Sequence, residues 1–151
     1  MNFNPMRLVT RLAMVTAALV VGAQMALAQT THKVAIHVDE ESIQTMNMAL
    51  NNAQNIAAYY EEQGEQVIIE IVTYGPGLHM LRADTSPVAQ RISAMALEME
   101  NISFAACQNT IDAMKRNSQK DVPLLSEATV VPSGAVRLIE LQEQGYAYLR
   151  P

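Results

Sequence analysis

The sequence predicts an α/β fold: a three-layer sandwich in which helices cover both faces of a mainly parallel sheet of four to five strands. Short apolar runs alternate along the chain with helical segments of about 10 to 20 residues, the pattern of βαβ units with right-handed crossovers. The run at 67–74 is nearly all apolar apart from Glu70, as expected of a strand that is covered on both faces. No internal repeat, low-complexity tract or linker divides the chain, which indicates a single domain.

The first strand and the first helix are predicted at 33–38 and from Ile43 to about Glu62. The strand is short and apolar, and an acidic cluster at 39–41 follows it, with Ser42 in a position suited to cap a helix. Apolar residues then recur at alternating steps of three and four, which marks one helical face. Gly64 is expected to end this helix.

The strand at 67–74 is expected to end abruptly at Gly75-Pro76-Gly77, followed by a helical turn at 78–82. Ser86-Pro87 then provides the residues favoured at a helix start. The apolar positions of this second helix share one face: Val88, Ile92, Met95 and Met99.

Strand character returns at 101–106, and from Cys107 the pattern is helical again, with Lys115 and Arg116 suited to the negative end of the helix dipole. Cys107 is therefore predicted to lie where a strand becomes a helix. A loop at 121–127 and a fourth strand at 128–131 follow. The last helix is expected from Gly134 to about Gln144, and residues 146–149 are expected to form an edge strand.

Residues 1–28 have the order of a secretory signal peptide: Arg7 and Arg11 flank an apolar run at 12–21, and Ala26-Leu27-Ala28 follows. This run is shorter than the roughly 20 apolar residues of a membrane span. We expect cleavage after Ala28, which leaves residues 29–151 as a single domain in the periplasm with no membrane attachment. An uncleaved anchor is the alternative, and N-terminal sequencing distinguishes the two.

The charge of the chain argues against nucleic acid as a partner. The formal net charge is -5, and loss of the two signal-peptide arginines takes it to -7. The remaining basic residues, such as Lys115, Arg116 and Lys120, are sparse and lack the interleaved aromatic residues that single-strand binding uses.

Cys107 is the only cysteine of the chain, so it cannot form an internal disulfide. In an oxidising compartment it must be buried, reactive or joined to another molecule. A buried free cysteine often acts only as a small hydrophobic residue. Its position at a helix start favours the reactive alternative, because the amides of the first turn and the helix dipole stabilise a thiolate.

Three features lie at the carboxyl ends of predicted strands, where sites collect in open α/β sheets. They are the acidic cluster at 39–42, the loop Gly75-Pro76-Gly77, and Cys107. Asn109 and Thr110 follow the cysteine and are candidates to bind an anion, or simply to cap the helix. Gly75 and Gly77 are candidates to offer backbone donors to a ligand, or simply to form a tight turn.

None of the three histidines has the spacing of a zinc site, so we expect no metal and no cofactor. His37 ends the first strand and His79 follows the glycine loop. Either of them is placed to approach the cysteine as a base or charge partner, or to be an ordinary core or surface residue.

Taken together, these segments resemble the DsrE/DsrF-like family of sulfur carriers, relatives of the sulfur-relay protein TusD. The resemblance covers nearly all of 29–151 and rests on the segments 33–38, 49–53 with Asn55, 74–78 (YGPGL), 104–110 (FAACQNT), 131–134 and 141–146. It implies a compact α/β sandwich, commonly a homotrimer or homohexamer, whose cysteine carries persulfide sulfur. Only Cys107 matches that role here.

The leading hypothesis is a periplasmic sulfur carrier that accepts sulfane sulfur on Cys107 from a small inorganic sulfur species or a partner thiol protein. The alternative is a non-catalytic oligomeric binding module with the same fold and an inert cysteine. A third hypothesis is a redox protein that forms a mixed disulfide with a partner, although the chain has no second cysteine to resolve it.

Overall fold

The computed structural model describes residues 30–151. The predicted signal peptide and its cleavage site after Ala28 lie outside the described residues. None of the helices in the described part combines the length and apolar character that a membrane crossing requires.

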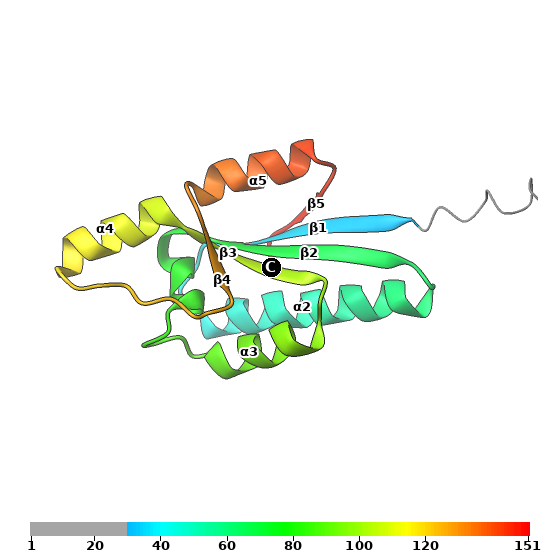
Figure 1. The fold of residues 1–151 in the computed structure, drawn as a ribbon, viewed down its shortest axis with the longest axis horizontal. Coiled ribbons are helices and arrows are strands. Elements are labelled where there is room, and N and C mark those ends of the chain that lie inside the picture. The colour runs from blue at the N-terminus through cyan, green and yellow to red at the C-terminus, as the bar shows by residue number, and fades with distance from the viewer. Residues whose placement is uncertain (1–29) are drawn as a thin grey trace, which may run out of the picture. The chain divides into compact units, whose positions relative to one another are not determined.

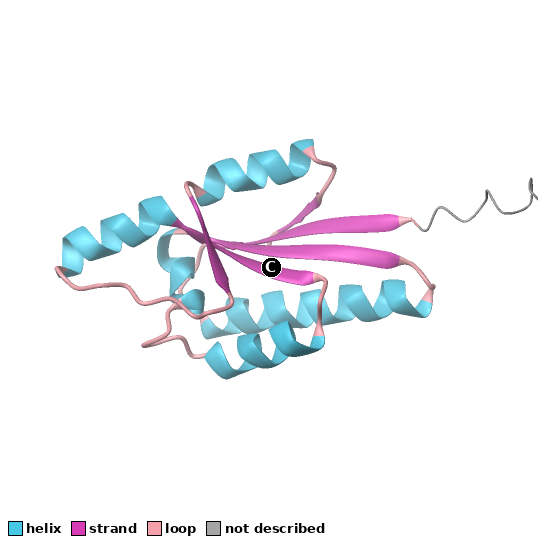
Figure 2. Ribbon diagram, viewed as in Figure 1, coloured by secondary structure: helices cyan, strands magenta, loops and turns pink. Residues whose placement is uncertain are grey.

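The centre of the domain is a sheet of five parallel strands, drawn as arrows in Figure 2. Along the sheet the order is β4-β3-β2-β1-β5. The strands are β1 (Thr31–Val38), β2 (Gln66–Thr73), β3 (Ile102–Cys107), β4 (Ala128–Val131) and β5 (Ala147–Leu149). The predicted parallel sheet is confirmed, and 147–149 is an edge strand, as expected.

Helices cover both faces of this sheet, which confirms the three layers (Figure 1). Helices α2 (Ile43–Glu62) and α3 (Ala89–Glu98) lie on one face, and α5 (Gly134–Glu143) lies on the other. The 3₁₀ helix η1 (Gly75–Leu81) and helix α4 (Gln108–Ser118) follow the carboxyl ends of β2 and β3.

The strand order explains why α5 lies alone on its face. The chain moves in one direction across the sheet from β1 to β4, and then returns past all of these strands to place β5 beside β1. Right-handed crossovers put helices on one face while the chain advances and on the opposite face when it returns.

The two faces have cores of different size, because alternate residues of a strand point to opposite sides. Ile36, Ile71 and Phe104 belong to the larger core with α2 and α3, whereas their neighbours along the strands pack under α5. The buried residues of the smaller core are Ala35, Val72, Ala105, Leu138 and Leu141. Because it is so small, this core leaves room for polar groups between α5 and the sheet.

Two predicted helix starts differ from the structure, and one helix is less buried than the others. Helix η1 begins at Gly75 rather than at residue 78. Helix α3 begins at Ala89 rather than at Ser86-Pro87, because Ser86 forms a turn: its hydroxyl donates to the Met80 carbonyl and accepts from the Val88 N–H. Helix α4 has no fully buried side chain. It starts where β3 ends, so its apolar side chains Ile111 and Met114 are only partly buried against the larger core.

Gly77 packs directly against the backbone at the end of β1. A Cβ atom at this position would lie 2.2 Å from the carbonyl oxygen of Val38 and 2.8 Å from the Cα of Asp39. Backbone atoms of a central strand cannot move aside as the tip of a flexible side chain can. The close approach therefore requires glycine, and it holds η1 against β1.

Replacing Gly77 with alanine should therefore destabilise the fold, by about 1–3 kcal/mol or more as overpacking typically does. Urea unfolding measures the loss. Gly64→Asn is the matched control, because nothing lies within 4 Å of a Cβ there and asparagine tolerates a positive φ. An unchanged unfolding midpoint for Gly77→Ala would contradict the close packing.

Candidate functional site

Cys107 lies at the end of β3, next to β4, and the helices that follow these two strands pack on opposite faces of the sheet. It is the last residue of β3, paired in register with Val131 of β4. Helix α4 follows Cys107 and packs toward the larger core, whereas α5 follows β4 and packs on the smaller core. In open α/β sheets, such a topological switch point is where ligands and reactive groups are found.

Four hydrogen-bond donors at the start of α4 and the start of α5 surround the Cys107 sulfur and favour its thiolate form. The donors are the backbone N–H groups of Asn109, Thr110 and Gly134, together with the Thr110 hydroxyl. Burial raises the pKa of the Cys107 thiol, but these bonds stabilise the thiolate by more. The resulting pKa lies below the ordinary value of a cysteine, which is the direction expected for a cysteine at a helix start.

Thr110 connects the cysteine to the glycine loop. Its hydroxyl oxygen accepts a 2.9 Å hydrogen bond from the Gly75 N–H, and the same hydroxyl donates to the Cys107 sulfur. With its oxygen occupied by a donor, the hydroxyl proton is directed to the sulfur. Gly75 thus acts on the cysteine through Thr110.

Gly134 is the residue that brings the second helix to the sulfur. A Cβ atom on Gly134 would lie 2.9 Å from Cδ1 of Tyr74 and 3.3 Å from Cβ of Cys107. Only glycine lets the first turn of α5 come this close. Ser133 caps that turn by accepting a hydrogen bond from the Val136 N–H.

The four residues that the sequence suggested around Cys107 differ in how they relate to its sulfur. Thr110 contacts the sulfur with its side chain and backbone, Asn109 does so through its backbone N–H, and Gly75 acts indirectly. Gly77 donates its N–H to the carbonyl of Tyr74 and packs on Val38. The structure therefore gives Gly77 a packing role rather than a contact with the sulfur.

His37 is buried at the end of β1, with 5% of its surface exposed. Its Nδ1 lies 2.7 Å from the hydroxyl of Tyr148. Its Nε2 has no hydrogen-bond partner within the described residues, although Oδ2 of Asp39 lies 3.8 Å away. Burial lowers the pKa of His37, Asp39 raises it and Arg150 lowers it, with a net decrease. The imidazole is therefore neutral at pH 7.

Tyr74 lies between His37 and Cys107 on the same face of the sheet. Its ring stacks on the imidazole, with centroids 4.7 Å apart, and its side chain contacts the position of Gly134. Burial raises the pKa of Tyr74, and the neighbouring Asp39 and Cys107 raise it further. The phenol is therefore protonated beside the sulfur.

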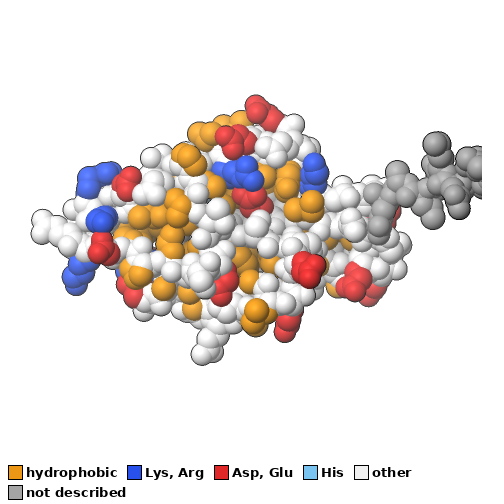
Figure 3. Space-filling view, viewed as in Figure 1, with side chains coloured by type: hydrophobic (Ala, Val, Ile, Leu, Met, Phe, Trp, Pro, Cys, Tyr) orange, Lys and Arg blue, Asp and Glu red, His pale blue; other side chains and the backbone are white. Residues whose placement is uncertain are grey.

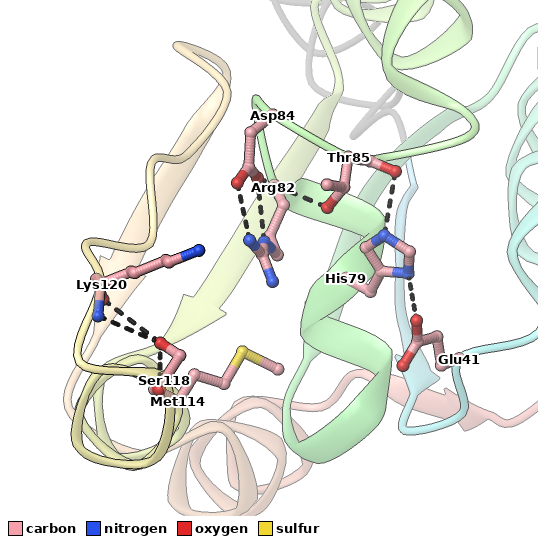
Figure 4. A network of polar contacts seen from close by, with 8 residues as sticks. All are labelled: Glu41, His79, Arg82, Asp84, Thr85, Met114, Ser118 and Lys120. Carbon is pink, nitrogen blue, oxygen red and sulfur yellow. Dashed lines mark hydrogen bonds and ion pairs between the residues drawn. The ribbon is translucent and has the colours of Figure 1, made fainter.

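His79 contacts Thr85 and Glu41 rather than the residues around Cys107. Its Nε2 lies 2.9 Å from the carbonyl oxygen of Thr85, and its Nδ1 lies 2.8 Å from the Glu41 carboxylate (Figure 4). The Nε2 bond and the closeness of Nδ1 to Glu41 link η1 to the neighbouring loops, although the geometry at Nδ1 is not that of a hydrogen bond. Of the two candidate histidines, His37 is the one that stacks on Tyr74, whose side chain packs against Gly134.

The acidic cluster after β1 is also engaged in ion pairs. Arg150 donates to both carboxylate oxygens of Asp39 and to Glu40, while Glu41 pairs with His79. These residues precede the helix cap Ser42, and the first turn of α2 has no acidic residue. They therefore join the carboxyl edge of the sheet to the C-terminal segment and to η1.

Within 30–151, no three histidine, cysteine, aspartate or glutamate side chains come together as metal ligands would. The chemistry that the site supports is that of its sulfur. A thiolate held by four donors is a nucleophile, and the same donors make the sulfur a good leaving group in exchange reactions.

Sequence reasoning missed Gly134 and Tyr74. Both follow the carboxyl end of a strand, which is the signal that pointed to Cys107. Pairing of β3 with both β2 and β4 then places them on either side of the cysteine.

Comparison with known proteins agrees with the fold. Residues 32–151 match the DsrE/DsrF-like family. A solved structure of a protein of unknown function from Methanobacterium thermoautotrophicum is similar, with 33% sequence identity and a TM-score of 0.66. The similarity covers 80% of this chain and 99% of the other. No curated protein matches the sequence. Because the family match spans almost the whole described domain, this chain belongs to the DsrE/DsrF-like family.

Proposed function

We propose that this protein carries sulfane sulfur as a persulfide on Cys107, receiving it from one thiol compound and passing it to another. The observation that carries the proposal is the cluster of four donors on one sulfur, three from α4 and one from α5. Membership of the DsrE/DsrF-like family supports a role in sulfur relay.

The transfer of sulfane sulfur between thiols needs no external oxidant or reductant. The Cys107 thiolate attacks the outer sulfur of a donor persulfide, a new S–S bond forms, and the S–S bond of the donor breaks. The donor thiolate leaves and takes a proton from water. In the second half, an acceptor thiolate attacks the outer sulfur on Cys107, and the Cys107 thiolate leaves.

The same hydrogen bonds serve both halves of this cycle. In the first half, they keep Cys107 ionised so that it can attack. In the second half, they stabilise the thiolate that departs, and a thiol of lower pKa leaves faster. Thr110 contributes both its hydroxyl and its N–H, so it is the residue whose side chain most affects the exchange.

Burial of the sulfur is the observation that favours the alternative. Cys107 is only 4% exposed, as expected of an inert cysteine in a binding module with the same fold. Under our proposal, the side chains around Gly134 and Tyr74 must move for a donor to enter. The two functions therefore differ in whether the cysteine of the folded protein reacts.

Loading with sulfur tests the proposal. Incubation of the purified protein with a low-molecular-weight persulfide or polysulfide should add the mass of one sulfur atom, located on Cys107 by peptide mass spectrometry. Loaded protein should then lose that mass to a small acceptor thiol, because the Cys107 thiolate is a good leaving group.

Cys107→Ser is the control for this experiment and should gain no mass. If the folded wild-type protein gains no sulfur from persulfide, polysulfide or thiosulfate, and resists alkylation as well, the inert binding module is the correct function.

Replacing Thr110 with valine should raise the pKa of Cys107, because the variant keeps the shape of the side chain and removes the hydroxyl donor. The dependence of the alkylation rate on pH should move to higher pH. Asn109→Ala is the matched control: Asn109 acts through its backbone N–H, so the pH dependence should stay as in the wild type. Equal profiles for Thr110→Val and wild type would count against the hydroxyl bond.

The proposal includes export to the periplasm, which the order of residues 1–28 supports. Detection of the full-length chain in the cytoplasm alone, by cell fractionation, would refute this part.

It also includes a homo-oligomer, as the resemblance implies. Val130, Val136 and Ile139 on β4 and α5 are about half exposed, and Figure 3 shows hydrophobic side chains at the surface of the face turned to the viewer, where β4 lies. A monomer mass by light scattering would refute the assembly.

A further inference from the structure

We infer that the ion pair of Glu70 and Arg137 positions the N-terminus of α5 so that the Gly134 N–H reaches the Cys107 sulfur. Neither residue bonds to the sulfur, so each is a positioning residue. The inference rests on the proposed function, because it concerns the hydrogen bonds that make the same sulfur reactive.

The pair links the middle of the sheet to the first turns of α5. Glu70 lies in β2, in register with Ala35 of β1, and is 8% exposed. Arg137 donates from Nε to one carboxylate oxygen and from a terminal nitrogen to the other, both at 2.7 Å. Two parallel bonds between planar groups fix both the distance and the orientation of the helix.

Apart from the close packing of Gly134 against Tyr74 and Cys107, few contacts fix this end of the helix. The buried apolar side chains of α5 are Leu138 and Leu141, and both follow Arg137 in the chain. Val136, one residue before Arg137, is half exposed. Arg137 therefore supplies the side-chain anchor closest to Gly134, which lies about one helical turn away.

Stability alone does not explain why a carboxylate is buried here. Removing a charge pair from water costs about as much as the pair returns, and apolar residues of similar size often stabilise a fold equally well. An apolar pair would also pack on the smaller core. What an apolar pair lacks is directional bonding, which is the property that positioning a single N–H requires.

The charges of the pair do not account for the effect on the cysteine. Burial raises the pKa of Cys107 and hydrogen bonds lower it, with Gly134 foremost among the bonds, and neither Glu70 nor Arg137 is among the causes. Direct electrostatics and positioning also make opposite predictions. Removing the negative charge of Glu70 would by itself favour the thiolate, whereas losing the position of Gly134 disfavours it.

Two variants separate these effects. Glu70→Met removes the carboxylate and keeps an unbranched side chain, and Arg137→Lys keeps the positive charge while losing the planar fork. For both, the pH at which alkylation of Cys107 reaches half its maximal rate should move upward. Circular dichroism verifies that each variant is folded, and Arg137→Lys alone suffices if Glu70→Met does not fold.

Two matched controls should leave the pH profile unchanged. Glu140→Gln removes the second carboxylate near Arg137, at 3.5 Å, and leaves Glu70 in place. Arg91→Met removes an arginine that donates to Asn47, Asn51 and Gln54 of α2, on the opposite face of the sheet. These variants show how far the profile changes when a carboxylate or an arginine is lost outside the Glu70–Arg137 pair.

A downward shift or no shift in folded Arg137→Lys would overturn the inference, as would a downward shift in Glu70→Met. The proposed function fails by a different result: wild-type Cys107 that ionises no more readily than a free thiol, or that takes up no sulfur. The two failures are therefore distinguishable within one set of measurements.

Discussion

The N-termini of two helices, α4 and α5, lie close to the sulfur atom of Cys107, and the candidate site depends on this proximity. Helix α4 offers the N–H groups of Asn109 and Thr110, and α5 offers that of Gly134. A helix N-terminus carries partial positive charge and unpaired amides, so two of them can offset the cost of ionising a sulfur that is only 4% exposed. The rest of the domain serves this approach: strand order brings α4 and α5 together, and small residues let them come close.

Much of the fold follows from local patterns in the sequence. The alternation of apolar strands with amphipathic helices predicted the parallel three-layer architecture, and Gly64 follows the end of its helix with a positive φ, as its position indicated. Boundaries were less predictable where side chains make local bonds, as Ser86 does before α3. The degree of burial in α4 also depends on where the helix lies past the strand ends, and periodicity alone carries no such information.

The site was predictable in part. Cys107 at a strand-to-helix junction, with Thr110 in the first turn, follows from local sequence. Gly134 and Tyr74 required the register of β2, β3 and β4, and the bond between His37 and Tyr148 required β5 to pair with β1. Gly77 shows the limit most clearly: as a loop residue it resembles a ligand-binding glycine, and only its distance to Val38 reveals its packing role.

The most direct test of this account is a titration of the Cys107 thiolate by ultraviolet absorbance, taken as the difference between the wild type and Cys107→Ser. The difference removes the tyrosine contribution, and Cys107 is the only cysteine. We expect the thiolate to form at a lower pH than that of a free cysteine, in the folded protein without any partner. A thiolate that forms only at the pH of a free cysteine, or above it, would contradict the account.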